Sequence, residues 1–262
     1  MAEMEKTAML ADGSNPEGVD PQPPLEWTRE SIMNSKVTVY GVVGSPPCSK
    51  LLFYLNFYGV KHELVGGPKP GSDYKKMPVV DIGDRQVNDS AVILKHLVPA
   101  LVGDGGFDAA WETKITYGLQ VSIENEIMGS YEDFAAFFGE PHGFGIPSFV
   151  MYCAGSMIMS TIRKGILANP LNTVVDPATI LAEFAAAKGD KPFFGGDEPA
   201  AVDISTYGTL ASFVQSEVAI ALSLVGGAGL WPWFVKMDEK APLRAIYPLT
   251  NLDLKKIEND TK

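Results

Sequence analysis

The sequence predicts two units in succession: a small α/β domain with the element order β-α-β-β-β-α, and then an all-helical domain. Three observations lead to this prediction. Short β-rich runs are confined to residues 37–88, helical periodicity dominates after residue 108, and Gly103, Gly105 and Gly106 form a breaker-rich stretch between the two parts. The length of 262 residues exceeds one typical domain of roughly 150 residues and agrees with two packed units.

The first 35 residues are expected to form an acidic, proline-containing extension. They contain Pro16, Pro21, Pro23 and Pro24 and few aliphatic side chains, which is typical of a solvated segment. The first 25 residues carry five acids against a single lysine and lack an apolar stretch. Neither a signal peptide nor an arginine-rich transit peptide is therefore predicted.

The first domain is expected to span residues 36–99. A strand at 37–42 precedes a helix at 48–58, in which Leu51, Leu52 and Leu55 recur at helical spacing before Gly59 ends it. Strands follow at residues 61–65, 77–82 and 85–88, and a second helix is expected at residues 90–97, with Asp89 and Ser90 as candidates for its cap.

The second domain is expected to span residues 106–245, before a polar tail at 246–262. Helices are predicted at 108–128, 148–167, 176–188, 202–224 and 233–240. Two long charge-free runs, 141–162 and 218–235, have the length of membrane spans, but glycines and prolines interrupt both. Buried core helices are the preferred interpretation, and no transmembrane segment is expected.

Charge and cysteine content exclude several function classes. The 32 acidic and 21 basic residues give a net charge of −11, which would repel a phosphate backbone, so nucleic acid is not an expected partner. The two cysteines, Cys48 and Cys153, cannot form a disulfide framework, and no Cys/His grouping has zinc spacing. No metal site is predicted, and an intracellular, reducing location is expected, in the cytoplasm or in an organelle such as the mitochondrion.

The layout resembles that of the soluble glutathione transferases, whose first domain has a thioredoxin-like fold. Four stretches are more narrowly similar to the type 2 prostaglandin E synthase branch of that superfamily. They are residues 39–50 with Ser-Pro-Pro-Cys at 45–48, residues 74–79, residues 87–93 and residues 231–234. The resemblance covers about residues 37–240 and makes glutathione the expected small-molecule partner.

The resemblance places the γ-glutamyl end of glutathione at Asp89 and Ser90. A helix N-terminus and a serine suit its carboxylate, and an acidic side chain suits its ammonium group. The alternative is a plain N-cap, and the two roles are compatible. The resemblance further implies a cis peptide bond at Pro78, with the backbone of Met77 pairing with the cysteinyl part of glutathione. From the sequence alone, Pro78 is equally well a proline that opens a strand at the edge of the sheet.

The turn at Ser45 departs from the family pattern. Relatives in this branch carry Cys-x-x-Cys, whereas Ser45 replaces the first cysteine, so dithiol redox activity is not expected. The Ser45 hydroxyl is expected either to donate to a glutathione thiolate, as in serine-type transferases, or only to cap the helix by accepting from the Cys48 N–H. Cys48 has a helix-lowered thiol pKa if exposed, or else packs inward. Cys153 is expected to be a buried apolar group.

Two further positions bear on the ligand. The segment at 66–71 is too rich in glycine and proline for the helix that usually contacts the glycine end of glutathione, which leaves Lys75 or Lys76 to reach that carboxylate. Haem, which the resembled branch holds through bound glutathione, has no evident protein ligand and is not expected without glutathione. Asp203, preceded by Ala200 where relatives have serine or threonine, is interpreted as a structural helix cap.

Two functions are therefore compatible with the sequence. The first is a glutathione transferase-like protein with an altered active-site turn, which as an enzyme would be a glutathione-dependent transferase or isomerase. The second is a non-catalytic accessory subunit or adaptor of a larger, organellar complex that involves the N-terminal extension. A homodimer formed through the helical domain is compatible with either function.

Overall fold

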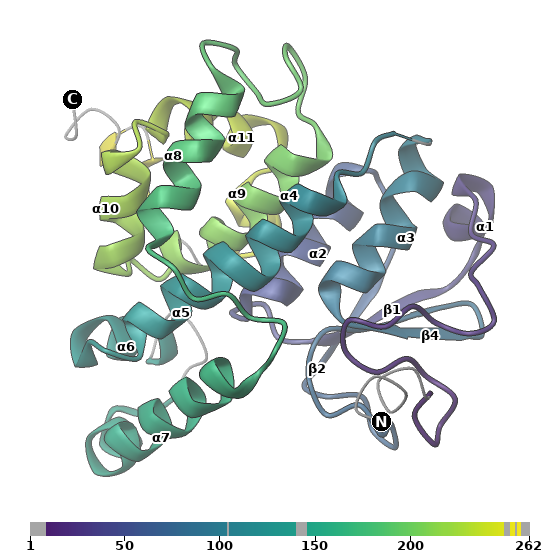
Figure 1. Ribbon diagram of the computed structural model, residues 1–262, viewed down its shortest axis with the longest axis horizontal. Coiled ribbons are helices and arrows are strands. Elements are labelled where there is room, and N and C mark those ends of the chain that lie inside the picture. The colour runs from purple at the N-terminus through teal and green to yellow at the C-terminus, as the bar shows by residue number, and fades with distance from the viewer. Residues whose placement is uncertain (1–8, 104, 140–145, 249–251, 255, 258–262) are drawn as a thin grey trace.

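The computed structural model describes residues 9–103, 105–139, 146–248, 252–254 and 256–257. Within this part of the chain, the predicted fold class is confirmed: a four-stranded sheet with its helices is followed by a larger helical region (Figure 1).

The sheet has the strand order β2-β1-β3-β4. β1 (Val37–Gly41) is parallel to β2 (Glu63–Gly66) and antiparallel to β3 (Val79–Ile82), which is antiparallel to β4 (Arg85–Asn88). Val39 is buried at the centre of the sheet, where it is paired with Leu64 on one side and Val80 on the other. A parallel pair needs a crossover connection, and α2 (Pro46–Phe57) supplies it between β1 and β2.

Helix α3 (Ser90–Val102) follows β4 and continues beyond the predicted end at residue 97. Pro99 lies inside this helix, and the buried side chains of Val98 and Leu101 extend its packed face. The helix ends at Gly103, whose φ of 91° suits a residue without a Cβ atom. The predicted link at 99–106 is therefore shorter than expected. A short helix, α1 (Arg29–Asn34), precedes β1 and lies against α3.

The helical region begins with a continuous rod that changes its winding. α4 (Ala109–Lys114) passes into a π-helical stretch, η2 (Ile115–Gln120), and then into α5 (Val121–Ile127). α6 (Tyr131–Phe138) was not predicted. It is followed by α7 (Ser148–Ala168) and α8 (Pro177–Lys188). The predicted helix at 202–224 is in fact two helices, α9 (Ala201–Val214) and α10 (Ala219–Gly227), because Glu217 between them adopts a φ of 54°. α11 (Trp231–Lys240) and a 3-10 turn, η3 (Leu243–Ala245), complete the region.

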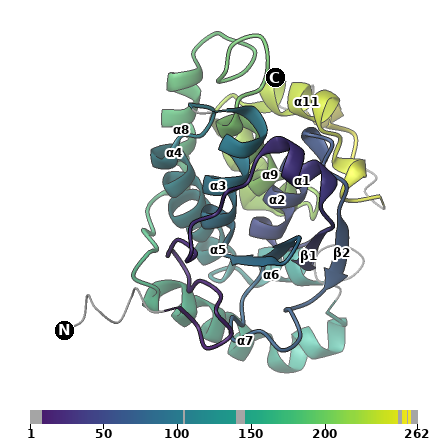
Figure 2. The same cartoon turned by 90° about the vertical axis from the view of Figure 1, so that its right-hand side faces the viewer.

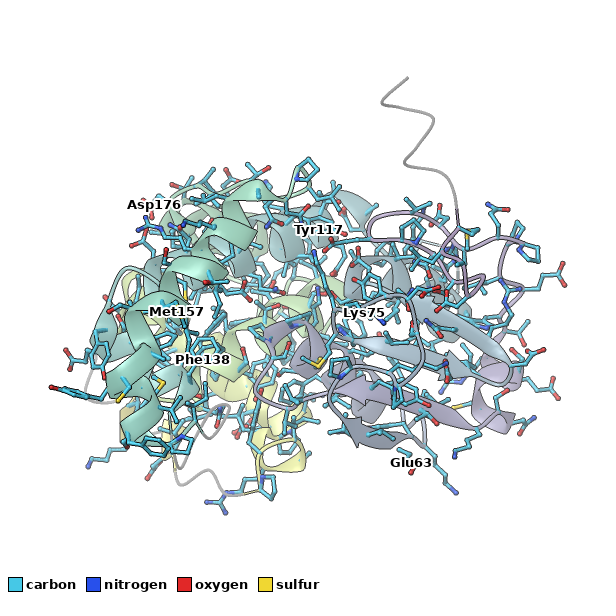
Figure 3. All side chains as sticks on the ribbon, turned by 90° about the horizontal axis from the view of Figure 1, so that it is seen from below. Glu63, Lys75, Tyr117, Phe138, Met157 and Asp176 are labelled. Atoms are coloured by element: carbon cyan, nitrogen blue, oxygen red, sulfur yellow. The ribbon has the colours of Figure 1, made fainter. Side chains whose placement is uncertain are left out.

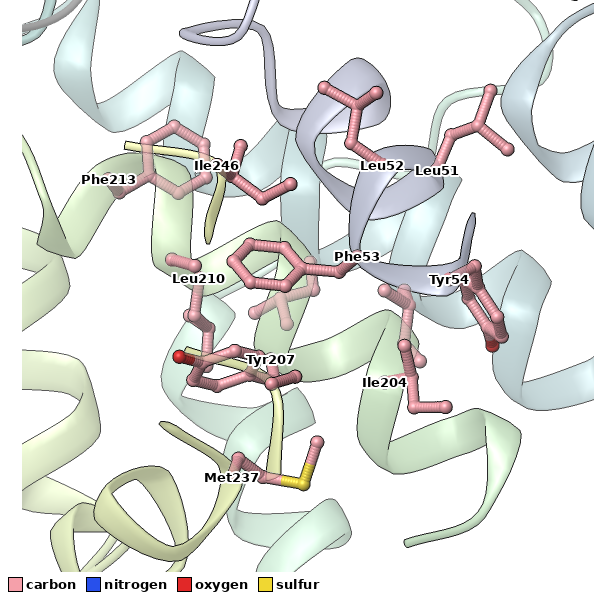
Figure 4. Close-up of a cluster of buried hydrophobic side chains, with 14 of the residues drawn as sticks. Leu51, Leu52, Phe53, Tyr54, Ile204, Tyr207, Leu210, Phe213, Met237 and Ile246 are labelled. Atoms are coloured by element: carbon pink, nitrogen blue, oxygen red, sulfur yellow. The ribbon is translucent and has the colours of Figure 1, made fainter. Parts of the chain in front are cut away.

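The two regions share a core in which α2 packs against α9 (Figure 4). The rings of Phe53 and Tyr207 meet edge to face, with their centroids 5.0 Å apart. Ser49 donates a hydrogen bond of 2.9 Å to the carbonyl of Gly208. A Cβ atom on Gly208 would lie 2.8 Å from the Cα of Lys50, so only glycine permits this close approach of the two helices. The sheet domain and the helical region therefore form one packed body.

Asp203 stabilises the start of α9, in agreement with its predicted structural role. Its buried carboxylate accepts hydrogen bonds from the backbone N–H groups of Phe194, Gly195 and Ala200 and from the indole of Trp233. Four donors around one carboxylate compensate for its burial.

The described part of the N-terminal extension, defined as residues 1–35, runs beside the first domain instead of into solvent (Figure 2). Ser14 and Asn15 are almost completely buried, so the prediction of a wholly solvated segment is wrong. In the described chain, no single helix has the length and apolar character of a membrane span. α10 and α11 meet those criteria only as a pair, bent by 108°.

Candidate functional site

A groove of about 330 Å³ lies where the two regions meet. Four of the six predicted site residues line it: Ser45, Met77, Asp89 and Ser90. The helical region supplies most of an apolar wall on the other side, formed by Val121, Met128, Phe137, Phe138, Ile162 and Ile166. Cys48 and Pro78 do not line the groove. The predicted residues from three separate segments therefore come together.

Ser45 occupies the N-cap position of α2, but its hydroxyl does not cap the helix. The expectation that it accepts from the Cys48 N–H is therefore wrong. Pro46 and Pro47 occupy the first helical positions, and the Ser45 hydroxyl instead hydrogen-bonds to the Cys48 sulphur. Ser45 is 8% exposed and lines the groove, so its oxygen lies between the helix start and the groove.

Cys48 packs inward, which was one of the two alternatives left by the sequence. Its side chain is fully buried, and a Cβ atom on Gly41 would lie 2.5 Å from its sulphur, so the thiol fills the space that this glycine leaves. Burial raises the pKa of Cys48 to about 11, although hydrogen bonds from Ser45 and the Val42 backbone act in the opposite direction. In this environment Cys48 is a packing residue and not a nucleophile.

The peptide bond between Met77 and Pro78 is cis, as the resemblance implies. Pro78 is buried at the entrance to β3, and Met77 faces the groove. Tyr74, which the sequence analysis did not single out, is buried beside it, and its pKa is raised by burial and by the negative charges of Asp89 and Glu17. The groove therefore collects acidic side chains on its polar side.

Asp89 and Ser90 lie at the start of α3, as predicted, and Asp89 is its N-cap. One carboxylate oxygen of Asp89 accepts from the Ala91 N–H at 2.9 Å. The other accepts from the Gly18 N–H at 2.8 Å and from the Tyr117 hydroxyl at 2.6 Å. Asp89 is only 5% exposed, and burial raises the pKa of its carboxyl. The carboxylate predicted to meet the ammonium group of glutathione is thus already held by donors of its own chain.

Tyr117 is a site residue that the sequence did not reveal, because it comes from the helical region. In Figure 3 it lies near the junction of the two regions, as does Lys75, whereas Met157 lies away from that junction on α7. The π-helical stretch η2 carries Tyr117 and also Gln120, which lines the same groove. Single π-turns are frequent at functional sites.

Glu124 is the second site residue that the sequence missed. It lines the apolar side of the groove, and its carboxylate accepts a hydrogen bond of 3.2 Å from the side-chain amide of Gln120. Burial raises the pKa of Glu124 to about 7. A carboxyl with such a pKa can hold or release a proton near neutral pH.

The lysines proposed for the glycine end of glutathione are both engaged with the chain itself. Lys76 forms an ion pair with Glu17 of the extension, and Lys75 donates to the carbonyl of Ser72. The segment between β2 and β3 contains no helix, as predicted. Among the described residues that line the groove there is no histidine or cysteine. No cluster of metal-ligating side chains occurs within the described ranges.

Cys153 differs from its prediction. It lies exposed on the outer face of α7, near the exposed aromatic side chains of Phe149 and Tyr152. The apolar run at 148–159 suggested burial, but α7 is in contact with its neighbours along one face only, where Met151 and Gly155 are buried.

Among known proteins, similarity was found only to solved structures. No family model and no curated protein matches the sequence. A serine-to-cysteine mutant of poplar glutathione transferase F1 is 12% identical, with a TM-score of 0.53, over 86% of this chain and 99% of that chain. The Tau class glutathione S-transferase of mango is 17% identical, with a TM-score of 0.48, over 86% and 96% of the two chains. A delta-class glutathione transferase of Nilaparvata lugens is 14% identical, with a TM-score of 0.48, over 86% and 100%.

At these identities the likeness establishes the fold alone. The similarity to the poplar enzyme extends over both regions, because it covers nearly all of that chain. This chain therefore has the glutathione transferase fold, with a thioredoxin-like domain followed by a helical domain.

Proposed function

We propose that this protein is glutathione transferase-like and binds glutathione in the groove between its two regions. The observation that carries the proposal is the convergence of Ser45, Met77 and the Asp89–Ser90 turn on one cavity. In this arrangement the γ-glutamyl end lies at the start of α3, where the helix dipole and Ser90 favour its carboxylate and Asp89 favours its ammonium group. The cysteinyl part pairs with the backbone of Met77, which places its sulphur toward Ser45.

Ser45 is the candidate for stabilising the thiolate. Lowering a thiol pKa by about 2 units requires roughly 2.7 kcal/mol, and a helix end supplies only about 0.3–1 kcal/mol. Pro46 and Pro47 lack the amide hydrogens that would otherwise face the sulphur. A hydrogen bond from the Ser45 hydroxyl to the charged sulphur, worth about 1.5–3 kcal/mol, would supply the difference. For this, the hydroxyl must turn from the Cys48 sulphur toward the groove.

The apolar wall around Phe137 and Ile166 suits an apolar electrophile held next to that thiolate. The finer resemblance, to the type 2 prostaglandin E synthase branch, adds peroxide isomerisation as a second reaction for this groove. It depends on the Pro78 and Asn88-Asp89-Ser90 motifs. The Ser45 turn departs from that branch, so conjugation is the reaction to test first.

The test of binding is calorimetric titration of glutathione into the wild type and an Asp89→Ala variant. The expected dissociation constant of the wild type is about 1 mM or lower, equivalent to about −4.1 kcal/mol, and the variant should lose this binding. Asp84→Ala is the matched control, since Asp84 is exposed in the turn between β3 and β4. Equal binding by the Asp89 and Asp84 variants would refute the proposed subsite.

The test of catalysis is turnover of a chlorodinitrobenzene electrophile with glutathione. Ser45→Ala should reduce kcat much more than it weakens glutathione binding, because the hydroxyl is assigned to the ionised sulphur. Cys48→Ala should leave kcat nearly unchanged, since Cys48 does not line the groove. Unchanged turnover in Ser45→Ala would reject the serine mechanism.

A non-catalytic accessory subunit of a larger complex is the second candidate. The observation that favours it is the engagement of the Asp89 carboxylate by three donors of its own chain, namely the Gly18 and Ala91 N–H groups and the Tyr117 hydroxyl. The described residues of the extension are held by the first domain itself and give no support to a partner there. Absence of glutathione binding together with a native size far above that of a dimer in a gentle extract would favour this candidate.

A further inference from the structure

The N-terminal extension is anchored to the edge of the sheet directly beside the groove. β4 is an edge strand, so the backbone groups of its last residue, Asn88, have no neighbouring strand on one side. The Asn15 side chain pairs with both groups: its Oδ1 accepts from the Asn88 N–H at 2.9 Å, and its Nδ2 donates to the Asn88 carbonyl at 2.9 Å. The Asn88 side chain donates in return to the Asn15 carbonyl at 2.7 Å. Both asparagines are fully buried, and their polar groups are satisfied by this contact.

The anchor brings two groups of the extension onto the charged positions of the groove. The Gly18 N–H donates to Asp89, and the Glu17 carboxylate pairs with Lys76. Under the proposed function, glutathione would offer the same chemistry to the same residues: an ammonium donor to Asp89 and, at its glycine end, a carboxylate to Lys76. The extension therefore presents a hydrogen-bond donor to Asp89 and a carboxylate to Lys76, the two kinds of group that the ligand would present there.

The extension also bridges the two sides of the groove. Gly18 lies against Leu171, in the segment that follows α7, since a Cβ atom on Gly18 would approach a δ-methyl of Leu171 to 2.8 Å. Glu17 lines the cavity itself. Asp89 is only 5% exposed, and the Gly18 N–H occupies a position on its Oδ2 that an incoming ammonium group would use.

We propose that residues 12–20 are a tethered competitor of glutathione, which occupies the γ-glutamyl position until Glu17 and Gly18 leave Asp89 and Lys76. This inference rests on the proposed function. When a segment of the same chain competes with the ligand, the apparent affinity equals the affinity of the open site multiplied by the fraction of molecules in which the segment is released. Conditions or partners that draw the extension away therefore activate binding without touching the groove.

The test is calorimetric titration of glutathione into the full-length wild type and a full-length Asn15→Ala/Gly18→Ala variant. Asn15→Ala removes both side-chain hydrogen bonds to the Asn88 backbone, whereas the bonds from the Asn88 side chain to the Ser14 hydroxyl and the Asn15 carbonyl remain. Gly18→Ala adds a methyl group that collides with Leu171 at a φ of 71°. The dissociation constant should fall by about tenfold or more in the double variant, as for a site that is closed in at least about nine molecules of ten. Glu26→Gln, an exposed change in the same extension, should bind as the wild type does.

A second measurement uses the wild type alone. Saturating glutathione should accelerate hydrogen exchange at the Gly18 amide, because this amide loses its acceptor, whereas amides in α9 should keep their protection. Unchanged protection of Gly18 at saturation would overturn the competitor. The competitor would also be overturned if the double variant kept the wild-type melting temperature and its dissociation constant agreed with that of the wild type within about twofold. In that case the proposed function would stand. Failure of both proteins to bind would refute the proposed function and the competitor together.

Discussion

Lys50 and Glu112 form a fully buried ion pair between the thioredoxin-like domain and the helical domain, with Nζ 2.5 Å from Oε1. Lys50 also donates to the Thr116 hydroxyl, which itself donates to Glu112 at 2.7 Å. Ser205 donates to the second Glu112 oxygen. The pair is thus part of a closed polar network in which α2, the α4–η2 rod and α9 meet.

Removal of one partner should be much more costly than removal of both. Lys50→Met leaves an uncompensated carboxylate in the core and should lower the free energy of unfolding by about 3–5 kcal/mol, whereas Lys50→Met combined with Glu112→Gln should recover part of that loss. Chemical denaturation measures both. Lys36→Met is the control, because it breaks the exposed Lys36–Glu63 pair and should cost no more than about 1 kcal/mol. Equal losses in the single and double variants would contradict this account.

The two cysteines should differ sharply in reactivity. Cys153 is exposed, while Cys48 is buried with a pKa of about 11, so only about one Cys48 thiol in a thousand is ionised at pH 8. An aromatic disulfide reagent should therefore label one thiol quickly and the second only after denaturation. Cys153→Ser should abolish the fast phase and Cys48→Ser should leave it intact. Fast labelling that survives in Cys153→Ser would show that Cys48 is accessible.

Glu124 should make the stability of the protein depend on pH near neutrality. Its pKa is raised from 4.5 to about 7, so the folded state binds the proton more tightly than the unfolded state does. The destabilising effect of this residue is complete above pH 7 and disappears as the pH falls toward 4.5. The wild type should therefore gain up to about 3 kcal/mol relative to Glu124→Gln between pH 8 and pH 5. Glu126→Gln, a change at an exposed neighbour, should show the same dependence of stability on pH as the wild type. If Glu124→Gln also showed the wild-type dependence, the raised pKa of Glu124 would be disproved.

Asp203 should be much more important for stability than an ordinary helix cap. Asp203→Ala leaves the N–H groups of Ala200 and Phe194 and the indole of Trp233 without their acceptor, and should cost at least about 3 kcal/mol, compared with about 1 kcal/mol for a typical cap. Thermal unfolding compared with Asp197→Ala, an exposed carboxylate in the preceding loop, measures the difference. A loss no larger than that of the control would mean that water replaces the carboxylate.

The elements of the fold were largely predictable because local signals specify them. The strand that begins at Val79 and the helix that begins after Asp89 follow from β-rich runs and capping residues. The orientation of Cys48 did not follow, since α2 is buried on most of its surface, with α9 and α3 packed against it, and its sequence has no single apolar face. Tyr117 was missed because its role depends on packing between domains, 28 positions after Asp89. The seating of Asn15 on Asn88 depends on amide hydrogen bonds, which leave no periodic pattern in a sequence.

The π-helical stretch between Ile115 and Gln120 changes the direction in which the side chains after it point in the otherwise α-helical rod formed by α4, η2 and α5. A π-turn has more residues than an α-turn, so every side chain after it is rotated about the rod axis relative to a continuous α-helix. Thr116 bonds to Lys50 before the shift is complete, and Gln120 and Glu124 follow it on the groove side. Winding the same residues as a continuous α-helix would turn Glu124 by about 100°, whereas deletion of a single residue within 115–120 would restore α-helical winding and leave Glu124 on the groove side. The winding of this short segment thus decides which side chains of the helical domain face the groove.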